Sequence, residues 1–408
     1  MSTPLRILLS APDVGDVERT SLLEAFDSNW ISTAGPAIAE FENAMTERIG
    51  RPCVAVSSGT AGLHLALRLA GVEPGDTILC QSLTFVASAN PILYEKAVPV
   101  FLDSEPRTWS IDPNALEDAI KLRTRGGRRP RALIVVHLYG MPAEIESIRT
   151  ICETHGIALI EDAAESLGST VHCRETGIFG QAGVFSFNGN KIITTAGGGM
   201  VAVSNEEDAA QLRKWSTQSR EIATHYEHSE LGYNYRMSNL LAALGSAQLR
   251  KLPEKIRRRR EIFFRYERGI ADLGGIIFQP EAAGSLSNRW LSAMWIDPAI
   301  WPGKRDALIS HLATRGIETR PLWKPMHLQP LFQDAPYFGS SVSETLFRSG
   351  LCLPSSSALS HEQQEDVIQA IRDFFLVQSK QSTAPSHSLS TLPQYNNLTS
   401  SSSALLRD

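Results

Sequence analysis

Cysteine is scarce in this sequence, and its placement excludes two ways of stabilising a fold. Five cysteines are scattered along 408 residues, and no two of them form a C-x-x-C pair. An odd number of dispersed thiols suits neither a disulfide framework nor a structural zinc site, and it is typical of proteins from a reducing compartment. We therefore expect free thiols, no metal site and a location in the cytoplasm.

Long apolar runs and an excess of positive charge are also absent. No stretch approaches the roughly 18 uninterrupted apolar residues of a membrane span. The apolar run at residues 7–9 is too short for a signal peptide, and acidic residues soon follow it. The formal net charge of −5 argues against a protein built to hold nucleic acid, so the basic runs at residues 121–131 and 257–260 are interpreted as solvated surface. These absences predict a soluble protein with neither a membrane nor a nucleic-acid partner.

Short apolar runs do occur, and they alternate with helical patterns from about residue 50 to about residue 205. The runs that look like buried strands are residues 53–56, 77–80, 99–102, 132–137 and 158–160. Such alternation favours an α/β fold with a mostly parallel sheet covered by helices on both faces. Ligands collect at the carboxyl ends of the strands in sheets of this type. Polar residues that follow a strand are therefore candidates for a site.

Beyond about residue 250 the pattern changes to a smaller α+β arrangement. Helices are predicted over residues 254–273, 306–314 and 362–376, and strands over residues 290–296 and 316–319. The sequence thus predicts a large α/β domain over residues 1–250, which includes the N-terminal segment, and a small α+β domain over residues 251–377. Residues 378–408 are rich in Ser, Thr, Leu, Asn and Pro, and they are predicted to form a disordered tail.

Three segments that follow predicted strands carry groups suited to chemistry. Residues 57–62 (SSGTAG) open a helix whose first N–H groups suit a phosphate, although an ordinary helix cap explains them equally well. Asp162 suits a protonated ring nitrogen, a metal or a helix cap. Lys191 lies between a strand and a triple glycine, where its amine can form a Schiff base, although most lysines are simply solvated. Ser186, close to it in sequence, offers a hydroxyl to a phosphate.

The order of these segments matches the needs of one cofactor, pyridoxal phosphate (PLP). A protein that uses PLP must anchor the phosphate, keep the ring nitrogen protonated and supply an amine for the aldehyde. Phe85, after the strand at residues 77–80, offers a ring to stack on the cofactor, although core packing explains it equally well. The order therefore predicts PLP, with Lys191 as the residue that carries it.

Eight segments of the sequence resemble the sugar aminotransferases of the DegT/DnrJ/EryC1/StrS family, which have the aspartate-aminotransferase fold (PLP fold type I). The segments stand in the family's order between about residues 10 and 375. They are NWISTAGP (29–36), SSGTAGLHLAL (57–67), LTFVASAN (83–90), HLYGMP (137–142), EDAAESLG (161–168), residues 183–199, GYNYRMSN (232–239) and PMHLQP (325–330).

This resemblance implies roles for individual residues. Lys191 is implied to carry the cofactor and Asp162 to pair with its ring nitrogen. The other implied cofactor contacts are Gly59, Thr60 and Ser186 at the phosphate, Phe85 on the ring, and Glu165 on the hydroxyl side, where many relatives have Gln.

The resemblance also implies a homodimer with shared active sites. Asn234 is implied to reach the phosphate held by the neighbouring subunit, with Arg236 close to it. The candidates for substrate binding are Asn29, Trp30, Arg220, Arg236 and His327. Packing explains Trp30 nearly as well, and an ordinary surface charge explains Arg220 nearly as well.

Within the family, residues 187–195 (FNGNKIITT) and 220–230 (REIATHYEHSE) most resemble the enzymes that aminate C4 of UDP-4-keto-6-deoxy-N-acetylglucosamine. The resemblance thus implies transfer of the amino group of L-glutamate to that ketone, which gives a UDP-4-amino-sugar for glycan or polysaccharide biosynthesis. The alternatives are an aminotransferase of another nucleotide keto-sugar (GDP-perosamine-type or dTDP-3-keto-sugar), a PLP-binding regulatory protein without turnover, and a sugar dehydratase. Lys191 speaks against the dehydratase, because known dehydratases of this fold have His in its place.

Overall fold

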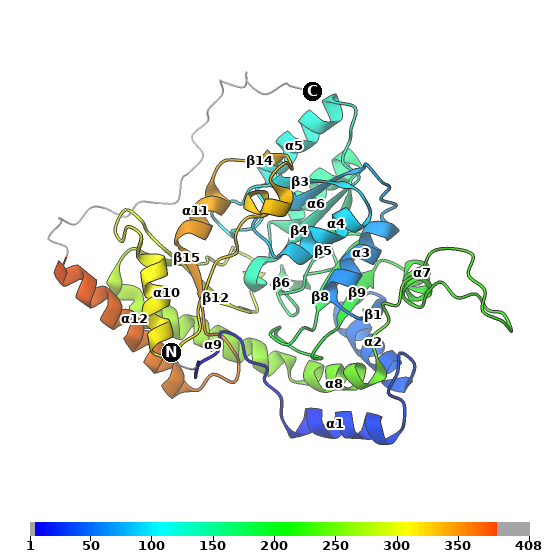
Figure 1. Cartoon of the computed structure of the whole chain (residues 1–408), viewed down its shortest axis with the longest axis horizontal. Coiled ribbons are helices and arrows are strands. Elements are labelled where there is room, and N and C mark those ends of the chain that lie inside the picture. Colours follow the sequence, from blue (N-terminus) through cyan, green and yellow to red (C-terminus); the bar gives the residue numbers. More distant parts are fainter. Residues whose placement is uncertain (1–4, 382–408) are drawn as a thin grey trace.

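The computed structural model describes residues 5–381 of the chain, and Figure 1 shows them as two lobes side by side. The larger lobe is a sheet surrounded by helices, and the smaller lobe is a second sheet with helices α9, α10 and α12. The helix α12 continues to Gln381, past residue 377, where the sequence analysis ends the small domain. The rest of the predicted tail, residues 382–408, lies outside the described residues.

The larger sheet has eight strands in the order β1-β9-β8-β5-β4-β2-β3-β14. Their bounds are β1 (Cys53–Val56), β2 (Thr77–Gln81), β3 (Val98–Leu102), β4 (Ala132–Val136), β5 (Ala158–Asp162), β8 (Ala182–Ser186), β9 (Gly199–Val203) and β14 (Tyr337–Phe338). Strand β9 is antiparallel to both of its neighbours, and all other neighbouring pairs are parallel. The predicted α/β fold with a mostly parallel sheet is therefore confirmed.

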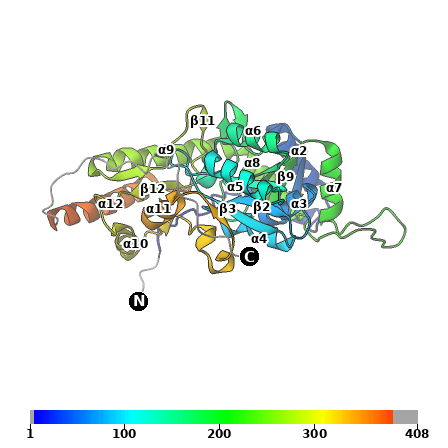
Figure 2. The ribbon, with the colours of Figure 1, turned by 90° about the horizontal axis from the view of Figure 1, so that it is seen from above.

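Helices cover both faces of this sheet, and β1 shows how the two cores are separated. Val54 and Val56 pack into the core beneath α3 and α7, whereas Cys53 and Ala55 pack into the opposite core beneath α2 and α8. This alternation follows from the two-residue period of a strand. The helices of the larger lobe are α1 (Asp16–Asp27), α2 (Pro36–Ile49), α3 (Gly59–Leu69), α4 (Asn90–Tyr94), α5 (Pro113–Arg125), α6 (Ile145–His155), α7 (Glu206–Ser216) and α8 (Asn239–Arg250). Figures 1 and 2 both show the segment after α7 extending away from the body of the molecule.

The smaller lobe contains an antiparallel sheet in the order β10-β12-β15-β13. Its elements are α9 (Leu252–Ile270), β10 (Ile276–Phe278), β12 (Ser292–Ile296), α10 (Lys304–Thr314), β13 (Arg320–Pro321), α11 (Val342–Ser349), β15 (Gly350–Leu353) and α12 (His361–Gln381). The predicted helices and the strand within residues 290–296 are confirmed. The predicted strand at residues 316–319 is wrong, because Ile317 pairs with Ile7 in a single parallel bridge and the chain joins the sheet only at β13.

The N-terminal strap, residues 6–13, is held mainly by residues near the other end of the described chain. The carbonyl of Gly316 accepts from the N–H groups of Arg6 and Ile7 at 2.8 and 3.0 Å. The N–H of Ser355 donates to the carbonyl of Leu9 at 2.8 Å, and Ile7 is buried in the core of the smaller lobe. The strap therefore leaves the smaller lobe before the chain enters α1 of the larger one.

The interpretation of the two basic runs as solvated surface is wrong for several of their arginines. Arg259 is fully buried, and Arg260 forms an ion pair with Glu281 at 2.6 Å. Arg131 is exposed as predicted, although its Nε also donates to the carbonyl of Ala70 at 3.0 Å. These guanidinium groups stabilise the packing of elements, because each satisfies acceptors that the fold brings to it.

Among residues 5–381 no helix is long and apolar enough to span a bilayer.

Candidate active site

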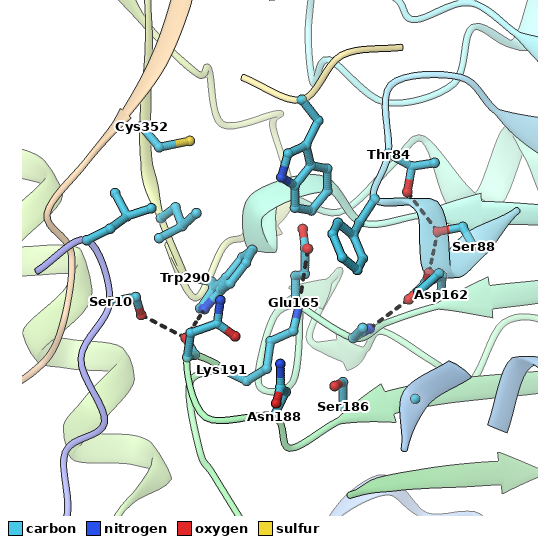
Figure 3. A pocket seen from close by; sticks show the side chains of 18 of the residues that line it. Ser10, Thr84, Ser88, Asp162, Glu165, Ser186, Asn188, Lys191, Trp290 and Cys352 are labelled. Carbon is cyan, nitrogen blue, oxygen red and sulfur yellow. Dashed lines mark hydrogen bonds and ion pairs between the residues drawn. The ribbon is translucent and has the colours of Figure 1, made fainter. Parts of the chain in front are cut away.

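A cavity of about 660 Å³ lies between the two lobes at the carboxyl ends of strands of the larger sheet. Asp162 ends β5 and Ser186 ends β8, and both side chains line the cavity, as Figure 3 shows. The smaller lobe contributes Trp290 and Cys352, and the N-terminal strap contributes Ser10. The site therefore stands where the sheet topology predicts it, with walls from three separate parts of the chain.

Lys191 extends its amine into this cavity from the loop after β8 (Figure 3). Its Nζ lies 3.2 Å from Oε1 of Glu165 and 4.1 Å from the centre of the Trp290 ring. Only 12% of its side chain is exposed, so the amine is largely withdrawn from water. A desolvated amine with few accessible positions is well suited to nucleophilic attack on a carbonyl.

The loop that carries Lys191 is fixed at the carbonyl of Asn190. This oxygen accepts two hydrogen bonds, from Ser10 Oγ at 2.7 Å and from Trp290 Nε1 at 2.8 Å. Both donors are themselves held by the buried guanidinium of Arg259, which donates to Ser10 Oγ at 3.2 Å and to the carbonyl of Trp290. The strap and the smaller lobe thus set the position of the residue next to Lys191.

Asp162 is buried at the base of the cavity and forms part of a chain of polar groups. Its Oδ2 accepts from Ser88 Oγ at 2.6 Å, and Ser88 Oγ lies 2.7 Å from Thr84 Oγ1 (Figure 3). The N–H of Ala164 donates to Oδ1 at 3.1 Å. Burial raises the pKa of Asp162 because the low-dielectric surroundings disfavour its charged form. A cationic partner in the cavity would relieve that cost.

Glu165 is the second buried carboxyl group of the cavity. Oε2 accepts from the N–H of Tyr139 at 2.7 Å, and Oε1 faces Lys191. Burial raises the pKa of Glu165 to about 7, and the attraction of Lys191 offsets only part of this effect. Glu165 therefore changes charge near neutral pH.

Glu161 precedes Asp162 in the sequence but does not belong to the cavity lining. It is fully buried and accepts hydrogen bonds from His137 Nε2 and from the N–H groups of Gly177, Phe179 and Gly180. These contacts organise the loop before β8. Successive side chains of β5 point to opposite faces of the sheet. Glu161 therefore supports the loop before β8, while Asp162 faces the cavity.

The N-terminus of α3 forms another wall of the cavity. Gly59 and Thr60 are the first residues of this helix, whose first N–H groups have no acceptor within the helix. Ser58 caps the helix by accepting from the N–H of Ala61 at 3.0 Å. A Cβ on Gly59 would lie 3.0 Å from Cβ of Ser186, so the two residues face each other closely. Donors and a hydroxyl converge here in a way that suits a phosphate.

Phe85 lines the cavity at its more open side and is 55% exposed. Its ring centre lies 5.8 Å from that of Trp323, which belongs to the smaller lobe. Core packing therefore does not account for Phe85. Seven of the predicted cofactor residues line this one cavity: Gly59, Thr60, Phe85, Asp162, Glu165, Ser186 and Lys191.

The other predicted site residues lie outside the lining of this cavity. Asn29, Trp30, Arg220 and Asn234 are exposed, and the guanidinium of Arg220 lies over the ring of Tyr226. Arg236 forms an ion pair with Glu42 and donates to the carbonyl of Ala55 at 3.1 Å. His327 is engaged by Ser82 at 2.7 Å and Glu344 at 3.4 Å, and it stacks on Tyr337. Their predicted roles at a cofactor or substrate stay predictions.

Some cavity residues were not predicted as site residues from the sequence: Ser10, Trp290, Arg320 and Trp323. Trp290 was visible only as the start of an apolar run, and Ser10 lies in a short segment without periodicity. All four depend on how the smaller lobe and the strap pack against the larger sheet. No local pattern in the sequence encodes that packing.

The chain matches known proteins over nearly its whole described length. The model of the DegT/DnrJ/EryC1/StrS aminotransferase family matches residues 12–372. EpsN of Bacillus subtilis, provisionally named a pyridoxal phosphate-dependent aminotransferase, is 49% identical over 91% of this chain and 96% of its own length. GDP-perosamine synthase of Caulobacter vibrioides is 36% identical over 91% of this chain and 99% of its own.

A solved structure resembles the whole fold. The aminotransferase TlmJ from Streptoalloteichus hindustanus superposes with a TM-score of 0.85 at 32% sequence identity, and the match covers 91% of this chain and 100% of TlmJ. The similarity thus includes both lobes.

Proposed function

Because this chain belongs to the DegT/DnrJ/EryC1/StrS family of PLP-dependent sugar aminotransferases, we propose that it transfers the amino group of L-glutamate to the C4 ketone of a UDP-4-keto-6-deoxy-N-acetylhexosamine. The product is a UDP-4-amino-sugar for glycan or polysaccharide biosynthesis. One observation carries the assignment of the site. The Lys191 amine, the Asp162 carboxyl group and the N-terminus of α3 converge on a single cavity.

The residues present fit PLP at each of its functional groups. Lys191 Nζ would hold the aldehyde. The buried Asp162 would pair with the protonated ring nitrogen, a cation that would relieve the cost of burying its charged form. The other cavity residues that would hold PLP are Gly59, Thr60 and Ser186 at the phosphate, Phe85 over the ring and Glu165 on the hydroxyl side.

The chain's own groups account for the proton movements of the reaction. When bound, PLP would supply an electron sink for the proton transfers and would hold the amino group between the two half-reactions. Lys191 Nζ takes the proton from the α-carbon of glutamate, and in the second half of the cycle it delivers a proton to C4 of the sugar. Glu165 Oε1 lies 3.2 Å from this amine and is placed to orient it. Trp290 and Phe85 restrict water around the reacting atoms.

The choice of UDP sugar is supported by residues 187–195 and 220–230, which resemble those of UDP-sugar 4-aminotransferases. A GDP-4-keto-sugar is the second candidate, because GDP-perosamine synthases of Caulobacter vibrioides and Escherichia coli are 36% and 35% identical to this chain. The two candidates share the carbon that is aminated and differ in the nucleotide and in the group at C2.

A panel of keto-sugar nucleotides assayed with L-glutamate tests the proposed function. We expect turnover with UDP-4-keto-6-deoxy-N-acetylglucosamine and little with the GDP and dTDP counterparts, measured by release of 2-oxoglutarate. Turnover with the GDP sugar alone would replace the proposed substrate with the second candidate. An enzyme that captures PLP yet turns over none of them would revive a regulatory, non-catalytic role.

Two substitutions test the proposed site. Lys191→Ala should abolish turnover and the visible absorbance of lysine-bound PLP, because no other cavity residue among those described offers an amine. Asp162→Asn keeps the shape but removes the charge, and it should lower turnover by at least about a hundredfold. Lys121→Ala, on the exposed side of α5, is the matched control and should change neither quantity. Wild-type turnover in either site variant would remove that residue from its role.

We also propose that the enzyme is a homodimer whose subunits complete each other's sites. Exposed apolar side chains on and just after α1 support this, namely Val17, Leu22, Leu23, Phe26, Trp30 and Ile31. The exposed Asn234 and Arg220 lie away from the cavity of their own subunit and are thus available to a partner.

Five free cysteines suit a reducing compartment, and we place the enzyme in the cytoplasm.

A further inference from the structure

The charged side chains that line the cavity are few, and each can be assigned. Three are carboxylates, Asp162, Glu165 and Glu318, and two are cations, Lys191 and Arg320. Among the described residues that line the cavity there is no other Lys, Arg or His. Lys191 is paired with Glu165 and, under the proposed function, carries the cofactor. Within its own subunit, Arg320 is therefore the cation left for a substrate.

Arg320 is placed at the cavity by the smaller sheet. It belongs to β13 and stands opposite Cys352 of β15, and Cys352 and Pro321 line the cavity with it. The side chain of Arg320 is 66% exposed, so its guanidinium stands at the solvent side of the cavity. An incoming anion can reach it without displacing protein groups.

The guanidinium is supported on one side and free on the other. Its NH2 donates to Glu318 Oε1 at 2.9 Å, while Glu318 Oε2 accepts from the N–H of Leu9 in the N-terminal strap at 3.1 Å. Within residues 5–381 Glu318 is the one polar partner of this guanidinium, which has five N–H donors. The strap thus fixes Glu318, Glu318 orients Arg320, and most donors of Arg320 remain available.

We propose that Arg320 binds a carboxylate of the amino donor while the donor's amine reacts at the Lys191 end of the cavity. The proposal rests on the proposed function, which supplies L-glutamate as the donor. A planar guanidinium matches a carboxylate through two parallel hydrogen bonds. The donor is short, so with its amine near Lys191 its carboxylates stay within the cavity or at its mouth, where Arg320 is the available cation of the same subunit. The phosphates of the sugar nucleotide are the other anions that could meet Arg320, and the test separates the two.

The test uses Arg320→Gln and Arg320→Lys, with Arg348→Gln as a matched control. Arg348 is also 66% exposed, also pairs with a single glutamate (Glu344) and also belongs to the smaller lobe, but it does not line the cavity. The half-reaction of PLP-bound enzyme with L-glutamate is followed by the loss of visible absorbance in single turnovers. Binding of glutarate, a dicarboxylate without an amine, is measured on the same enzyme by calorimetry.

We expect Arg320→Gln to raise the half-saturating glutamate concentration and the Kd of glutarate at least about tenfold, with a limiting rate within about twofold of wild type. Arg320→Lys should give values between those of the wild type and Arg320→Gln. It keeps the positive charge but loses the planar guanidinium that forms two parallel hydrogen bonds. Salt should weaken glutamate binding in the wild type more than in Arg320→Gln, since the guanidinium is solvated. Arg348→Gln should match the wild type throughout.

The inference is overturned if Arg320→Gln behaves like Arg348→Gln, or if only the KM of the keto-sugar nucleotide rises, which would assign Arg320 to the phosphates. Both results leave the proposed function intact, provided the wild type reacts with glutamate. A wild type that captures PLP but neither reacts with glutamate nor binds glutarate would overturn the proposed function and the inference together.

Discussion

Glu165 and Lys191 bring a carboxyl group and an amine within 3.2 Å of each other in a buried cavity. Burial raises the pKa of Glu165 from 4.5 to about 7, so the folded protein holds a proton there that the unfolded chain releases at lower pH. The stabilising contribution of this proton is fully present below about pH 4.5 and is lost as the pH rises to about 7. Neutral and alkaline solutions therefore destabilise the cofactor-free protein at this residue.

Glu165→Gln should remove that dependence on pH. The free energy of unfolding of the cofactor-free wild type, measured relative to the variant, should fall by up to about 3 kcal/mol between about pH 5 and pH 8. Denaturant titrations at several pH values measure it, and taking the difference cancels the other titrating groups. Glu117→Gln, on the exposed surface of α5, should give a curve parallel to that of the wild type. A constant difference between the wild type and Glu165→Gln would show that Glu165 does not titrate in this range.

The sequence predicts the role of a single residue where a side chain suited to the cofactor stands at or just after the end of a strand. Asp162 and Ser186 end β5 and β8, and Lys191 follows the second of them, so sheet topology alone brings them together. Trp290 and Arg320 were not predictable in the same way, because each lies on a strand or loop of the other lobe. Which of their neighbours face the cavity depends on how two separately patterned lobes pack.

At the scale of elements, α3 and β8 meet closely at the proposed phosphate site. Gly59→Ala would place a methyl group 3.0 Å from Cβ of Ser186. The first turn of α3 and the end of β8 must therefore shift relative to each other, which changes the shape of the proposed phosphate site. We expect affinity for PLP to fall on the order of tenfold, while stability without cofactor stays level or rises, because Ala favours a helix more than Gly. Absorbance titration with PLP and thermal unfolding measure the two quantities.

Gly189→Ala is the control for this prediction. Gly189 lies in the loop of Lys191, and a Cβ there would meet no atom within 4 Å. Affinity for PLP should therefore stay at the wild-type level. Equal affinities of Gly59→Ala and the wild type would mean that the phosphate does not sit against Gly59.

Elements with a clear period were predictable, and short ones were not. The bounds of strand β1 match the prediction, because its four apolar residues are buried on both faces and stand between Pro52 and Ser57. Strand β13 has two residues and was predicted too early, at residues 316–319. The apolar Ile317 that suggested a strand is buried against Ile7, a partner more than 300 residues away that no local pattern reveals.

At the scale of the whole molecule, the exposed side chains of α1 bear on assembly. Leu23 and Phe26 are 49% and 60% exposed although α1 packs against α8. The double variant Leu23→Glu/Phe26→Glu should convert the proposed dimer to a monomer, since burying two carboxylates in an apolar contact is costly. Sedimentation equilibrium measures the mass, and PLP affinity should fall with it because the partner's Asn234 is lost from the site.

Leu122→Glu is the control for assembly, because Leu122 is 58% exposed on α5, at another part of the surface. Its mass in solution should equal that of the wild type. A double variant at α1 that keeps the wild-type mass would move the dimer contact elsewhere or exclude the dimer.

The N-terminal strap also ties completion of the cavity to the order in which the chain is synthesised. Arg6, Ile7 and Leu9 of the strap are synthesised more than 300 residues before their hydrogen-bond partners Gly316 and Ser355. Until those residues emerge, the strap cannot support the carbonyl of Asn190 or orient Glu318. The nascent chain can build most of the larger sheet early, but its cavity remains open on one side until the smaller lobe has been synthesised.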